Sequence, residues 1–97
     1  MKAGIRVGAL VSATKELVKF LGYGIYEGDF LIEIEPGFSF PNPRIKLDNS
    51  DTVWGCECWW GPEDQIKHEI AWYSEQGAKI EEVRLEGRDN TPPKAAE

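Results

Sequence analysis

Three of the four tryptophans and both cysteines of this chain fall in one short run, Thr52–Trp60. Side chains alternate between the two faces of an extended strand. A strand over this run therefore places four large or soft apolar side chains on one face: Trp54, Cys56, Cys58 and Trp60. The opposite face carries Glu57 beside Trp59. We expect this strand to form either the centre of a small core or the wall of a binding site.

The size and charge of the chain exclude several classes of protein. Its 97 residues suit one domain. The formal net charge is −6, and the clustered Lys and Arg that phosphate binding requires are absent, so we expect no nucleic-acid partner. Apolar runs are too short for a membrane span, and the first residues lack the shape of a signal peptide. We therefore expect a cytoplasmic protein with no membrane partner and no disulfide framework.

The residues before the run read mainly as strands. Residues 5–11 predict a first strand with alternate residues, among them Val7, Ala9 and Val11, on one face. Residues 17–21 have the length and β-branched content of a strand, although a short helix is the alternative. Glycines at alternate or near-alternate positions over 22–28 mark bulges or tight bends.

Prolines interrupt the next segment. Pro36, Pro41 and Pro43 cannot donate to a sheet ladder, so residues 30–43 are expected to form a long loop that tucks in or displays Phe38 and Phe40. Residues 44–47 then pair with 52–60 as a β-hairpin, because the polar cluster at 48–51 is typical of a turn.

A helix is expected over about 62–75. Pro62 suits its first position, and Gly77 suits the residue that follows its end. Ile66, Ile70 and Tyr73 form one apolar stripe. Residues 79–85 then predict a charged edge strand. Residues 1–86 are expected to form one compact domain, and residues 87–97 a flexible tail.

The predicted fold class is α+β, mainly β. Its strands are short and its bends rich in glycine, with one helix before the last strand. This order suits a small, strongly bent antiparallel sheet or a partly open, SH3-like barrel. An open sheet with the helix on one face is the alternative.

Two kinds of chemistry use the cysteines. Cys56 and Cys58 could form part of a metal site with His68, but structural zinc sites use four ligands and a longer spacer between cysteines. A cysteine nucleophile would need His68 as its base, and the helical spacing turns His68 away from the apolar stripe. We therefore expect no cofactor and no metal, and we interpret both cysteines as small apolar residues.

The aromatic residues exceed what one face of such a core readily buries, so some of them are expected at a surface. Glu57 could recognise a cation there, with Trp59 as a stacking wall and Arg44 as a salt partner. The predicted ligand- or partner-binding residues are Tyr23, Tyr26, Phe38, Phe40, Arg44, Glu57, Trp59 and Trp60.

Three segments together resemble a set of short uncharacterised bacterial, phage and mobile-element proteins, such as integron cassette products. These segments are Gly22–Asp29, Ile45–Asp48 and Val53–Glu63. The resemblance spans roughly residues 4–70. It implies no activity, so it assigns no catalytic residue.

We carry three functional hypotheses from the sequence. The first is a small non-catalytic binding module with an aromatic surface, self-associating and taking a protein or small-molecule ligand. The second is an acidic protein that binds and inhibits a basic host protein. It requires several carboxylates to cluster on one face: Glu27, Asp29, Glu33, Glu35, Glu81 and Glu82. The third is an enzyme or metal protein that uses Cys56, Cys58 and His68.

Overall fold

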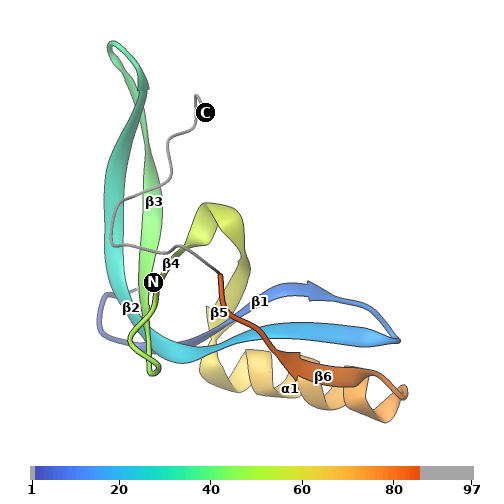
Figure 1. Ribbon diagram of the computed structural model, residues 1–97. Helices are drawn as coiled ribbons and strands as arrows, with labels where there is room; N and C mark the ends of the chain where they lie inside the picture. The colour runs from blue at the N-terminus through green and yellow to red at the C-terminus, as the bar shows by residue number, and fades with distance from the viewer. Residues whose placement is uncertain (1, 86–97) are drawn as a thin grey trace.

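The computed structural model of the chain describes residues 2–85 (Figure 1). The predicted tail, 87–97, and the expected domain boundary at residue 86 lie outside this range. The elements follow in the order β1 (Arg6–Ala13), β2 (Leu17–Glu35), β3 (Phe38–Leu47), β4 (Thr52–Trp54), a 3₁₀ helix η1 (Gly55–Glu57), β5 (Trp59–Pro62), α1 (Glu63–Glu75) and β6 (Lys79–Glu82).

The strands form one sheet in the order β4-β3-β2-β1-β5, with antiparallel neighbours throughout. The last strand, β6, pairs parallel to the first residues of β2. The sheet does not close into a barrel, so the predicted SH3-like barrel is not formed and the sheet stays open. The predicted mainly-β α+β class and the single helix before the last strand are confirmed.

One long strand, β2, organises the sheet. Its first part lies between β1 and β6, and its second part pairs with β3. The register shifts near Gly22 and again between Tyr26 and Gly28, and both glycines have positive φ, at 134° and 110°. Only glycine adopts such angles at little cost, so the predicted glycine bends are confirmed. Residues 17–21, left open between strand and helix, are a strand.

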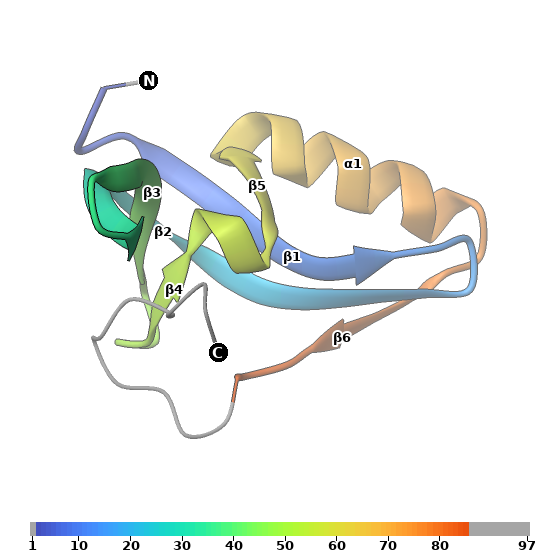
Figure 2. The same ribbon diagram turned by 90° about the horizontal axis from the view of Figure 1, so that it is seen from above.

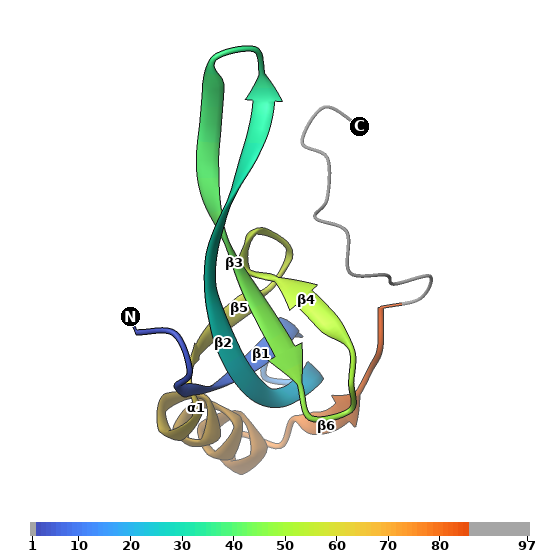
Figure 3. The ribbon, with the colours of Figure 1, turned by 90° about the vertical axis from the view of Figure 1, so that its left-hand side faces the viewer.

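The prediction of a long loop at 30–43 is wrong. The end of β2 and the start of β3 pair from Asp29↔Pro43 to Glu35↔Phe38 and form a twisted hairpin arm that projects from the body (Figures 1 and 3). Pro36 and Gly37, whose φ is +82°, supply the two central residues of its tight turn. Pro41 and Pro43 are tolerated because they lie at alternate positions of β3, so their missing N–H groups lie along one edge.

The sheet has a core on each face. Helix α1 covers one face through Ile66, which lies with Leu10, Val18, Phe20 and Ala78 (Figure 2). The other core gathers apolar residues from β1 to β4: Val7, Ala9, Leu21, Tyr26, Ile45, Leu47 and Val53.

The predicted face of β1 is only partly correct. Val7 and Ala9 are buried, but Val11 is exposed and Leu10 is buried instead. The register with β2 shifts on both sides of Leu10. A bulge of this kind moves the following side chains to the other face.

The tryptophan run is not one strand. Helix η1 separates β4 from β5, so the prediction that Trp54, Cys56, Cys58 and Trp60 share a face is wrong. The turn is fixed by Glu57, whose Oε1 accepts the backbone N–H of Trp54 at 3.0 Å. Trp54 is consequently buried, with 1% of its surface exposed, whereas Trp59 is 62% exposed.

The C-terminal elements agree with the sequence. Helix α1 spans Glu63–Glu75, and Ile70 and Tyr73 pack beside Ile66 as the stripe predicted. Among the described residues, strand β6 pairs with β2 alone and lies at an edge, although it ends at Glu82 rather than 85. No helix within residues 2–85 is long and apolar enough to span a membrane.

Candidate functional site

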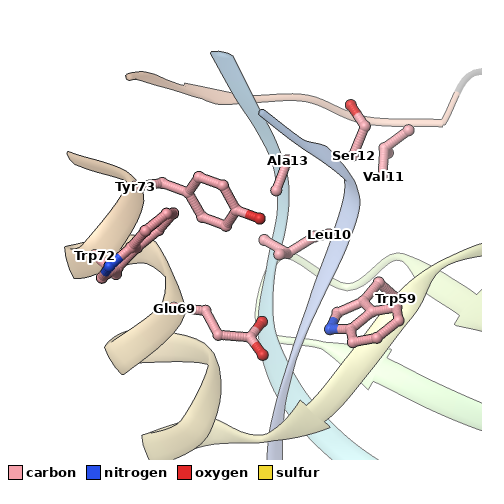
Figure 4. Close-up of a pocket in the computed structure, with 8 residues that line it drawn as sticks. All are labelled: Leu10, Val11, Ser12, Ala13, Trp59, Glu69, Trp72 and Tyr73. Atoms are coloured by element: carbon pink, nitrogen blue, oxygen red, sulfur yellow. The ribbon is translucent and has the colours of Figure 1, made fainter. Parts of the chain in front are cut away.

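A hollow of about 430 Å³ opens between the end of β1, the start of β5 and the second half of α1 (Figure 4). This volume lies within the range of small-molecule sites. We call it the indole pocket, and its lining residues are Leu10, Val11, Ser12, Ala13, Trp59, Glu69, Trp72 and Tyr73.

Helix α1 supplies one wall of the indole pocket. Glu69, Trp72 and Tyr73 are spaced by three and four residues, so they lie on one side of the helix. The rings of Trp72 and Tyr73 meet edge to face with centroids 5.0 Å apart, a geometry that orients both. Ile66 and Ile70 anchor the adjoining side of the helix on the sheet. The wall therefore stands on a packed helix.

The other wall comes from β1 and β5. Trp59 pairs with Leu10 across these strands. Because Leu10 belongs to the core under α1, it forms an apolar floor, and the bulge leaves Val11 exposed at the rim. Both tryptophans remain largely open to solvent, with Trp59 62% and Trp72 48% exposed. The pocket thus has two accessible indoles on separate elements.

One carboxylate lies in this aromatic setting. Figure 4 shows the Glu69 carboxylate pointing into the space between the helix and Trp59. Within residues 2–85, Glu69 has no hydrogen-bond or ion-pair partner. The ammonium of Lys15 lies 6.0 Å from the centre of the Trp72 ring, at the limit of a cation–π contact. Aromatic faces beside a free carboxylate are a setting that attracts an organic cation.

The structure separates the residues that the sequence grouped as a binding site. Among them only Trp59 lines the indole pocket. Tyr26 is buried and stacks on Trp60. Glu57 caps η1, and Arg44 pairs with Glu27 at 2.9 Å while its guanidinium lies 4.0 Å from the centre of the Phe30 ring.

The other predicted aromatic residues lie elsewhere. Tyr23 packs edge to face on Phe20 at 4.8 Å, and burial raises the pKa of its hydroxyl. The Lys67 ammonium lies 5.5 Å from the Tyr23 ring. Phe38 and Phe40 belong to the hairpin arm, where Phe38 is exposed and Phe40 half-buried.

The cysteines and the histidine also occupy different settings. Cys56 is exposed on η1, whereas burial raises the pKa of the Cys58 thiol to about 12. The exposed His68 has its Nδ1 3.0 Å from the Asp64 carbonyl oxygen, and it faces away from the stripe as predicted. Within the described part of the chain, no three histidine, cysteine or carboxylate side chains are grouped to hold a metal ion.

Sequence reasoning did not assign Glu69, Trp72, Tyr73 or the segment 10–13 to a binding site. A usable signal was present, because Glu69, Trp72 and Tyr73 have helical spacing and Trp72 falls outside the predicted stripe. No such signal marks residues 10–13, because the bulge beside Leu10 decides which of them are buried and which are exposed.

We compared the chain with protein-family models, with curated proteins and with solved structures, and none of them matches. The resemblance to short mobile-element proteins therefore stays a prediction.

Proposed function

We propose that this protein is a small non-catalytic binding module whose indole pocket takes an organic cation with apolar substituents. The observation that carries the proposal is the Glu69 carboxylate, which has no ion-pair partner among residues 2–85, within a hollow lined by Trp59, Trp72 and Tyr73. A cytoplasmic location fits the two free cysteines, since thiols persist in reducing compartments.

The physical basis is the combination of charge and ring faces. A cation over an indole gains about 0.5–2 kcal/mol, and quaternary ammonium groups suit such sites because they have little water to lose. A nearby carboxylate adds Coulomb attraction that ordinary apolar pockets lack. The net charge of −6 further favours the approach of a cation.

The size of the pocket limits the kinds of ligand that fit it. At about 430 Å³ the hollow exceeds a single ammonium group, and its floor at Leu10 and Ala13 is apolar. We therefore expect an alkylated amine that carries an apolar body. This chemistry occurs both in free quaternary amines and in methylated lysine side chains of peptides.

Binding of simple probes tests the proposal. Choline, a trimethyl-lysine peptide and the neutral choline isostere 3,3-dimethylbutanol are titrated separately into labelled protein, and the indole N–H signals of Trp59 and Trp72 are followed by NMR. We expect choline to bind about tenfold more tightly than its neutral isostere, because only the cation gains from the rings and the carboxylate. Tighter binding of the peptide than of choline would identify a side-chain reader, and the reverse a small-molecule carrier.

Two variants separate pocket binding from general charge. Glu69→Gln should weaken choline binding severalfold, whereas Glu75→Gln, an equal charge change on the same helix outside the hollow, should leave it unchanged. Equal affinity for choline and for the isostere would overturn the proposal. A different result would replace the proposal with self-association through the same indoles. In that result the protein binds no cation but forms concentration-dependent dimers, and Trp59→Ala prevents dimer formation.

A second candidate function is the binding of a basic protein. It is supported by three acidic residues on the hairpin arm, Asp29, Glu33 and Glu35, all of them exposed. Glu27 differs because it pairs with Arg44, and the carboxylates at 81 and 82 belong to β6. The test is retention of the protein on an immobilised polylysine surface. We expect retention to be lost when all three of these arm residues are replaced by Gln.

A further inference from the structure

The hairpin arm has an open strand edge. Strand β1 pairs with β2 only as far as Ile25, and the last backbone contact on that side is the Gly4 N–H donating to the Tyr26 carbonyl at 2.7 Å. Beyond this point, within residues 2–85, β2 pairs with β3 alone (Figure 3). An unpaired strand edge is a ready template for another extended chain.

The prolines of β3 determine which backbone groups point to this edge. In an antiparallel ladder, hydrogen-bonded and non-hydrogen-bonded pairs alternate. Proline has no N–H, so Asp29↔Pro43 and Leu31↔Pro41 are the non-bonded pairs. The N–H and C=O groups of Asp29, Leu31 and, by alternation, Glu33 therefore point away from β3, toward the open edge.

The side chains of the same residues define what could pair there. Asp29, Leu31 and Glu33 alternate along β2 and share one face, and all three are exposed, with Leu31 at 75%. Residues 28–43 contain no lysine or arginine. The edge thus presents an acidic, apolar, acidic pattern beside free backbone groups.

This pattern disfavours a second copy of the chain as the occupant. Antiparallel pairing of two β2 edges about Leu31 would set Asp29 of one copy directly opposite Glu33 of the other. Like charges directly opposite each other in a sheet are destabilising. The opposite edge of the arm is a poor template as well, because Pro41 and Pro43 remove donors from it.

We propose that the open edge of β2 binds an extended basic segment of another protein by strand addition. The partner would place Lys or Arg opposite Asp29 and Glu33 and an apolar residue opposite Leu31. Main-chain hydrogen bonds supply affinity in this mode, and the alternate side chains supply specificity. The inference rests on the second candidate function and is independent of the indole pocket.

The probe is a heptapeptide. It has arginine at positions two and six, valine at position four and threonine elsewhere. In strand addition its even positions face Asp29, Leu31 and Glu33 and donate to them. N-methylation at position four should therefore weaken binding about tenfold, because it removes a donor at the edge. N-methylation at position three, whose N–H points outward, is the matched control and should cost less than about threefold.

Variants of the protein provide the complementary test. Leu31→Pro should abolish binding but leave the hairpin folded, because the Leu31 N–H makes no bond to β3. Asp29→Lys with Glu33→Lys should switch preference to the same peptide with glutamate at positions two and six. The folded state of each variant is checked by the amide spectrum of β1 and α1.

The outcomes distinguish this inference from the function beneath it. Binding that ignores the position of the N-methyl group, and survives Leu31→Pro, would show a purely electrostatic surface. That result overturns strand addition and keeps the second candidate function. A peptide that does not bind at low salt overturns both, and identifies the carboxylates as charges that merely protect an edge from pairing.

Discussion

The indole of Trp60 stacks on the ring of Tyr26, with centroids 5.2 Å apart and planes inclined by 26°. The Tyr26 hydroxyl also donates to Oδ1 of Asp29 at 2.6 Å. Tyr26 therefore connects β5 to the base of the hairpin arm, two regions that are not paired directly as strands in the described part of the chain.

Loss of this stack should destabilise the whole fold. Trp60→Ala removes a half-buried ring from the core, and we expect it to lower the free energy of unfolding by about 3 kcal/mol. Tyr26→Phe keeps the stack and loses only the hydrogen bond, so it should cost about 1 kcal/mol. Urea unfolding followed by circular dichroism measures both, and a larger loss for Tyr26→Phe would contradict the stacking role.

Neighbouring tryptophans should differ sharply in their contribution to stability. Trp54→Ala leaves a cavity in the core, with an expected loss of about 4 kcal/mol. Trp59→Ala removes a largely exposed ring of the indole pocket and should change stability by less than about 1 kcal/mol. The same urea experiment compares them. Similar losses would mean that the run folds as one buried strand after all.

The two thiols should react at very different rates. Cys56 is exposed, whereas burial holds the pKa of Cys58 near 12, which leaves almost no thiolate at pH 8. Iodoacetamide should therefore modify one thiol quickly. Cys56→Ser should abolish this fast phase, and Cys58→Ser should preserve it. Two equally fast thiols in the folded protein, as in the denatured control, would contradict the burial of Cys58.

Acid should weaken a charge cluster at the start of β1. The Arg6 guanidinium bonds both oxygens of Asp48 at 2.7 Å and lies 3.3 Å from Glu63, and it lowers the pKa of both carboxyls. Groups with a lowered folded pKa stabilise above their unfolded values, here 3.8 and 4.5. This contribution is lost as the pH falls through the lower folded values.

We therefore expect Arg6→Met to reduce the acid-induced loss of stability below about pH 4.5. Near neutral pH, the slope of stability against pH should change little. Thermal melts between pH 3 and 7 compare the variant with the parent protein. Lys2→Met, which removes an exposed charge outside the cluster, is the control. An identical pH dependence for the parent and for Arg6→Met would exclude this coupling.

Local signals account for the parts of the fold that the sequence predicted. The apolar stripe lies within α1, and Gly77, with φ at 97°, follows its C-cap as predicted. Pro62, predicted as the first helical residue, is instead the N-cap, and the helix begins one residue later at Glu63. The bends at Gly22 and Gly28 were likewise readable, because glycine permits backbone angles that other residues avoid.

Pairing between distant residues explains what was missed. Pro41 and Pro43 break a strand in isolation, and only the pairing with β2 shows that one edge of β3 needs no donors. The alternation at Trp54 fails because Glu57 captures a backbone N–H and turns the chain. Trp59 was predicted as a site residue, but Glu69 reaches the same hollow only through the docking of α1.

The indole pocket joins residues 10–13 of β1 to residues 69–73 of α1, which lie far apart in the sequence, so the hollow exists only while α1 is docked on β1. A ligand that contacts both Trp59 and Trp72 would consequently stabilise the docked position of the helix. By mass action its binding must lower the population of molecules in which α1 is locally open, even though it touches only the second half of that helix. Amide hydrogen exchange around Ile66, which lines no part of the pocket, would then register occupancy from a distance.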